Sequence, residues 1–136
     1  MTNLPLISIV DDDASVRKSL QRLIRSVGYG VKVFASAEEY LKSEHLRHTN
    51  CLILDVRMPG MNGIELWREL VADGREIPVI FITAHGNKAA RSQALNDGAV
   101  DYLFKPFSEE SLLKAIQTAL NSDNKKQRAV ENLTNS

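Results

Sequence analysis

Five short apolar segments, separated by longer amphipathic stretches, constrain the fold of this 136-residue chain more than any other feature. The first, third and fourth segments are nearly continuous runs of Val, Ile and Leu, without the polar–apolar alternation of a half-exposed strand. Such runs are typical of parallel strands that are buried on both faces. The sequence therefore predicts five strands, at residues 6–10, 31–34, 51–54, 79–82 and 100–104.

The stretches between these strands repeat apolar residues at steps of three or four, as on one face of a helix. Strand and helix then alternate five times. Because crossovers between parallel strands are right-handed, this alternation predicts an α/β fold, a parallel sheet with helices on both faces. The first helix is expected to bury a face from Val16 to Val27 and to end at Gly28, and the fifth to begin after Ser108. The helices between them are expected from a capping-box pattern at 36–39 onwards, at 63–71 and at 88–96, the last being polar.

Composition excludes several classes of protein. Lys plus Arg and Asp plus Glu both number 17, so the net charge is zero, which argues against nucleic-acid binding by bulk charge. The apolar runs are too short to span a membrane, and the first residues do not read as a signal peptide. A single cysteine, Cys51, cannot form an internal disulfide and is typical of the reducing cytoplasm. A polar stretch from residue 121 predicts a domain at 4–121 and a tail or interdomain linker at 122–136.

Acidic side chains follow the first and third predicted strands. Asp11 and Asp12 come directly after residue 10, and Asp55 comes directly after residue 54. Because ligands bind at the carboxyl ends of the strands in an open parallel sheet, these carboxylates are expected to converge. Carboxylates so close would take up a proton unless a cation lay between them. An oxygen-only set of ligands predicts a hard cation, and Mg²⁺ is the usual one.

Groups suited to an anion follow the fourth and fifth predicted strands. The Thr83 hydroxyl and the Ala84 backbone N–H can donate hydrogen bonds, and Lys105 supplies a mobile positive charge. Carboxylates, a cation and these donors at one edge would receive a phosphoryl group. Since a carboxylate can act as a nucleophile, an aspartyl phosphate is feasible.

The same residues carry a resemblance to a known family. The segments Val10-Asp11-Asp12, Leu54-Asp55-Val56-Arg57-Met58-Pro59, Thr83-Ala84 and Tyr102-Leu103-Phe104-Lys105-Pro106-Phe107 resemble the receiver domain of two-component response regulators. Phe34-Ala35-Ser36-Ala37-Glu38-Glu39 and Thr83-Ala84-His85-Gly86 are most similar to the FixJ-type branch. The resemblance covers residues 4–121 and implies a flavodoxin-like, doubly wound, five-stranded parallel sheet in the order 2-1-3-4-5.

The resemblance also implies a function and roles for these residues. Asp55 would accept a phosphoryl group from a sensor histidine kinase, in the presence of Mg²⁺. Asp12, Asp55 and the backbone carbonyl of Arg57 would bind the metal directly, and Asp11 would act through metal-bound water. Lys105 and Thr83 would hold the phosphoryl group, and the rotamer of Tyr102 would report the state of Thr83.

The implied output is self-association. A FixJ-type receiver would form a homodimer on phosphorylation through its fourth helix and fifth strand, and would contact DNA only through an output domain absent from this chain. It would be a switch that assists its own phosphorylation and dephosphorylation, not an enzyme acting on other substrates, and no membrane partner is expected.

Other interpretations of the same residues stay open. Asp11, Asp12 and Asp13 could form a charged N-cap of the first helix, which is the role expected of Asp13. Tyr102 could be ordinary strand packing. His85 could affect how water reaches the phosphoryl group or could be a solvated loop residue.

The alternative functions are a stand-alone receiver that acts by protein–protein interaction and an aspartate-nucleophile phosphohydrolase. The second is disfavoured because Arg57 stands where such enzymes carry a general acid. A nucleotide-binding function is excluded because no glycine-rich phosphate loop follows the first strand.

Overall fold

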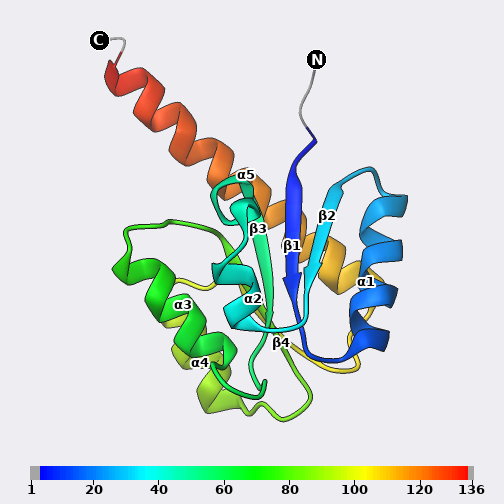
Figure 1. The fold of residues 1–136 in the computed structure, drawn as a ribbon. Helices are drawn as coiled ribbons and strands as arrows, with labels where there is room; N and C mark the ends of the chain where they lie inside the picture. The colour runs from blue at the N-terminus through cyan, green and yellow to red at the C-terminus, as the bar shows by residue number, and fades with distance from the viewer. Residues whose placement is uncertain (1–3, 135–136) are drawn as a thin grey trace.

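The computed structural model describes residues 4–134, and the side chains of residues 4–122. Five parallel strands form one sheet in the order β2-β1-β3-β4-β5, which confirms the predicted architecture (Figure 1). The strands begin or end within one residue of the predicted positions. They are β1 (Leu6–Val10), β2 (Gly30–Phe34), β3 (Cys51–Asp55), β4 (Val79–Thr83) and β5 (Asp101–Phe104).

Helices cover both faces of this sheet. They are α1 (Ala14–Ser26), α2 (Ala37–Leu41), the short 3₁₀ helix η1 (Glu44–His48), α3 (Gly63–Ala72), α4 (Lys88–Asn96) and α5 (Glu109–Thr134). Successive strand residues point to opposite faces. Ile7, Ile9 and Ile53 therefore pack with α1 and α5, whereas Leu52 and Leu54 pack with α2, α3 and α4. Among the described residues, no helix is both long and apolar enough to cross a membrane.

Local signals at the helix ends act largely as expected. Gly28 follows the last turn of α1 with φ +97°, a left-handed conformation that favours glycine. Val27 was expected on the buried face of α1, but its side chain is 47% exposed because the chain leaves the sheet at the C-cap. At the start of α2, the Ser36 hydroxyl accepts from the Glu39 N–H, but the Glu39 carboxylate accepts from the N–H of Ala35 rather than Ser36. The sequence did not predict η1.

The last helix crosses the expected domain boundary. Helix α5 continues without a break from Glu109 to Thr134, so residue 121 is not marked by a change in secondary structure. The division into a domain at 4–121 and a tail at 122–136 stays a prediction. Residues 135–136 of that tail lie outside the described residues.

Helix α4 is anchored weakly to the rest of the domain. Ala94 is its only fully buried residue, as its polar sequence predicts. A 3.6 Å ion pair between Arg91 and Asp101 joins α4 to β5. The helix therefore rests on β5 through a small apolar contact and a partly exposed ion pair, and neither opposes a shift strongly.

Candidate functional site

Three carboxylates meet at the carboxyl edge of the sheet. Val10 pairs with Leu54 in adjacent parallel strands, so the residues that follow them lie side by side. One oxygen each of Asp11, Asp12 and Asp55 lies within 4.8 Å of the others. Asp11 is fully buried, Asp55 is 6% exposed and Asp12 is exposed. The predicted convergence is therefore present, with one open side formed by Asp12.

Lys105 reaches this cluster from the end of β5. Its Nζ donates to Asp11 Oδ2 at 3.0 Å and lies 3.5 Å from Asp55 Oδ2. Burial alone would lower the pKa of Lys105, but the hydrogen bond and charge of Asp11, together with Asp55, raise it above its usual value. Lys105 is thus held charged beside Asp55, within reach of a group bound there.

The surroundings of Asp55 change its acidity. Burial and the neighbouring charge of Asp11 raise the pKa of Asp55 to about 6, although Lys105 and the Arg57 N–H act in the opposite direction. The Arg57 N–H donates to Asp55 Oδ1 at 3.2 Å. A cation among these oxygens would relieve the repulsion that raises this pKa. Their oxygen-only chemistry fits Mg²⁺.

Thr83 and Ala84 lie on the other side of Asp55. Asp55 pairs with Ile82 of β4, so Thr83 and Ala84 follow at the same edge. The Thr83 hydroxyl is buried and accepts from the His85 N–H at 3.1 Å. Ala84 is exposed at the mouth, where its small side chain leaves the edge open.

Tyr102 lies inside the domain rather than on its surface. Its side chain is 2% exposed, and its ring lies 5.6 Å from that of Phe104 and 6.1 Å from that of Phe81. Burial raises the pKa of the Tyr102 phenol. The loop at Gly86 contacts this ring and also Thr83, so the tyrosine and the threonine share one neighbour.

Not every acidic or histidine residue near the motifs joins the cluster. Asp13 turns away, and its Oδ1 accepts from the N–H groups of Ser15 and Val16, which caps α1 as expected. His45 and His48 lie in η1, which precedes β3 and is thus at the opposite end of that strand. Within the described residues, they join no group of potential metal ligands.

Three contributions at this edge were not predicted. Arg17 of α1 donates to the Asp11 backbone carbonyl at 2.7 Å. Glu38 of α2 accepts from the Met61 N–H. Gly63, the first residue of α3, lies so close to the Asp55 backbone that a side chain there would collide with it. None of these contacts has a periodic signature in the sequence, although the glycine at a helix start was a visible signal.

Comparison with known proteins agrees with the resemblance carried by the sequence motifs. The sequence pattern of the response regulator receiver domain matches residues 7–117. The chain belongs to this family. Receiver domains of response regulators are signalling switches, and they generally bind Mg²⁺ at an acidic pocket.

Individual relatives are regulators with a longer chain. Nodulation protein W of Bradyrhizobium diazoefficiens is 43% identical over 130 residues, covering 96% of this chain and 57% of that protein. The transcriptional regulatory protein FixJ of the same organism is 38% identical over 120 residues, covering 88% of this chain and 58% of that protein. The structure of the response regulator StyR superposes with a TM-score of 0.87 at 42% identity, covering 97% of this receiver and 67% of that chain. This receiver spans about half the length of the curated relatives.

Proposed function

We propose that this receiver is a phosphorylation switch in which Asp55 accepts a phosphoryl group from a phosphohistidine of a sensor kinase. The observation that carries the proposal is the contact between Lys105 and the two buried acids, Asp11 and Asp55. It puts a cation beside a carboxylate whose pKa is raised by burial and by the neighbouring charge of Asp11. The protein would act in the cytoplasm, as the composition predicts.

The transfer needs one nucleophile and several groups that accept charge. An Asp55 oxygen forms a bond to phosphorus while the phosphorus–nitrogen bond breaks, and the electron pair of that bond leaves with the imidazole. Lys105 and the Thr83 hydroxyl hold two phosphoryl oxygens, and the Ala84 N–H holds a third. Bound by Asp12, Asp55 and the Arg57 carbonyl, with Asp11 acting through water, Mg²⁺ would neutralise charge between the acids and the phosphoryl group.

One position argues against steady turnover of phosphate esters. Arg57 stands two residues after Asp55, where aspartate-nucleophile phosphatases carry a carboxylic acid as general acid. We therefore propose a single stoichiometric phosphorylation rather than a phosphohydrolase.

The Asp55 assignment is tested with a matched pair of variants. Incubation with Mg²⁺ and acetyl phosphate should add one phosphoryl group to the wild-type protein and none to Asp55→Asn, because an amide is a poor nucleophile. Asp13→Asn removes a neighbouring charge but keeps the cap of α1, so it should retain the adduct. Intact-mass spectrometry reads out both. An undiminished adduct in Asp55→Asn would refute the assignment.

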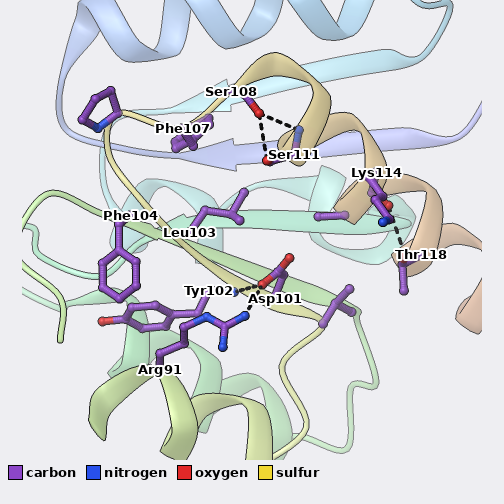
Figure 2. Close-up of a pocket in the computed structure, with 13 residues that line it drawn as sticks. Arg91, Asp101, Tyr102, Leu103, Phe104, Phe107, Ser108, Ser111, Lys114 and Thr118 are labelled. Carbon is purple, nitrogen blue, oxygen red and sulfur yellow. Dashed lines mark hydrogen bonds and ion pairs between the residues drawn. The ribbon is translucent and has the colours of Figure 1, made fainter. Parts of the chain in front are cut away.

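The output of the switch is proposed to be a homodimer formed through α4 and β5. Between β5 and α5, this face carries a cavity of about 540 Å³ lined by Arg91, Asp101, Tyr102 and Phe104, among others (Figure 2). Phe104 is 39% exposed there, and its ring contacts the ring of Tyr102. A Thr83 hydroxyl drawn towards the phosphoryl group would change the space available to Tyr102. In this proposal, DNA is contacted only by an output domain joined to the receiver.

A further inference from the structure

The loop between β3 and α3 closes over the phosphoacceptor edge and is tied at three places. At its start, the Arg57 N–H donates to the Asp55 carboxylate. At its end, the Gly63 N–H donates to the Val56 carbonyl at 3.1 Å. Its second half is held from outside, because the Met61 N–H donates to Glu38 Oε1 at 2.9 Å. The third contact joins residues 23 apart in sequence and ties α2 to the loop.

The chain near Glu38 is shaped to fit this carboxylate. Gly60 has φ +74°, a left-handed conformation that other residues rarely adopt. A Cβ at this position would lie 2.8 Å from Glu38 Oε1. The left-handed conformation favours glycine at position 60, and a side chain there would displace the Glu38 carboxylate. On the inner side, the buried Met58 packs into the core and anchors the same loop.

We propose that Glu38 is a positioning residue for the phosphoacceptor site, which acts by holding the second half of the loop that carries Arg57. This inference rests on the proposed function, because Arg57 is the residue whose backbone carbonyl is expected to bind the metal. A loop held by its own backbone contacts and also by Glu38 presents that carbonyl in one position. A loop without the Glu38 contact samples several positions and must be ordered when the metal binds, which weakens binding.

The electrostatics of Glu38 agree with this role. The hydrogen bond from Met61, the largest cause, lowers the pKa of Glu38 below its usual value. The carboxylate is therefore ionised at neutral pH and makes a charge-assisted hydrogen bond. Glu38 is exposed, so its side chain does not serve the hydrophobic core. Its conservative replacement by glutamine keeps an acceptor oxygen.

The adjacent residue is a matched control. Glu39 lies on the same helix, is exposed and also accepts from a backbone N–H, but its partner is Ala35, four residues away at the start of α2. Glu39→Ala thus removes the same charge and the same kind of bond without touching the loop. Three variants are compared with the wild type: Glu38→Ala, Glu38→Gln and Glu39→Ala.

Three measurements distinguish an effect on the loop from an effect on overall stability and from an effect on phosphotransfer. Amide hydrogen exchange at Met61, without metal, should accelerate in Glu38→Ala and stay unchanged in Glu39→Ala. Calorimetric titration with Mg²⁺ should show affinity about tenfold weaker for Glu38→Ala, within about twofold of wild type for Glu39→Ala, and largely restored for Glu38→Gln. Urea unfolding should show similar small losses for both alanine variants.

Each outcome bears on one proposal. Equal Mg²⁺ affinity for Glu38→Ala and Glu39→Ala, in a wild-type protein that binds Mg²⁺, would overturn the role of Glu38. So would unchanged exchange at Met61. Failure of the wild-type protein to bind Mg²⁺ or to accept a phosphoryl group would instead overturn the proposed function, whatever the exchange at Met61.

Discussion

At the acidic edge, the attraction between Lys105 and the carboxylates is opposed by repulsion between Asp11 and Asp55 and by their burial. These contacts therefore contribute less to the free energy of unfolding than their short distances suggest. Asp11 and Asp55 share Lys105, so one cation serves two acids. Burial and Asp11 then raise the pKa of Asp55 from 3.8 to about 6. Between these two values, folded Asp55 keeps a proton that the unfolded chain has released. By linkage, the contribution of Asp55 to the free energy of unfolding falls as pH rises through this window and stays low above it.

The predicted fall in stability with rising pH can be tested without a kinase or a phosphodonor. With a chelator present, Asp55→Asn should be more stable than the wild-type protein above pH 6, because it has no carboxylate to ionise. The advantage should shrink as the pH falls towards 4. Urea unfolding at about pH 7.5 and about pH 4.5 measures it. A difference in stability that is the same at both pH values would contradict the raised pKa.

The cluster itself could be predicted from sequence, because Asp11, Asp12 and Asp55 directly follow strand segments that are easy to recognise. The bond between Glu38 and Met61 could not, because it depends on the path of a loop and on a helix of five residues. The same holds for Arg17, whose spacing from Asp11 gives no signal that its guanidinium turns back to the Asp11 carbonyl. Strand ends predict where carboxylates gather, but they do not predict what holds the connecting loops.

At the scale of elements, the loop between β4 and α4 lies between Thr83 and the proposed dimer face of α4 and β5, and it carries Gly86 where these two regions meet. A Cβ at Gly86 would lie 2.6 Å from Thr83 Cγ2 and 2.8 Å from the Cε1 atoms of both Tyr102 and Phe104. The two rings and the threonine can pack together only because residue 86 has no side chain. The sequence did not predict this contact, since glycine in a loop is usually required for its backbone conformation.

Alanine at this position should therefore displace the rings. Gly86→Ala is expected to lower stability by about 1–3 kcal/mol through overpacking and to expose Tyr102. Exposure should move the phenol pKa of Tyr102 back towards 10, because burial is what raises it. Nuclear magnetic resonance titration of the tyrosine rings reads this out. Gly30→Ala is the control, since a Cβ there meets neighbours at 3.5 Å or more. Equal effects of the two variants would refute the packing argument.

At the scale of the whole molecule, the proposed output is a change in association. The domain should be a monomer without phosphate and a weak dimer with the phosphoryl mimic beryllofluoride and Mg²⁺, with dimerisation at least about tenfold tighter. Phe104→Ala should weaken that dimer. Val27→Ala is its control, because Val27 is 47% exposed at the end of α1, which packs beside β2 at the opposite edge of the sheet from β5. Analytical ultracentrifugation measures all three proteins, and a wild-type protein that stays monomeric with beryllofluoride would refute this output.

The direction in which the chain enters and leaves the sheet has a practical consequence. In Figure 1, the strands run towards the acidic cluster. The start of β1 and the end of α5 both lie at the opposite end of the sheet. A five-residue strand is roughly 17 Å long, so Leu4 and Thr134 are separated from the acidic cluster by at least about the length of a strand. A fluorophore, affinity handle or sensor-chip linkage attached at Leu4 or Thr134 therefore lies at the opposite end of the sheet from the acidic cluster and leaves that cluster open to a soluble phosphodonor.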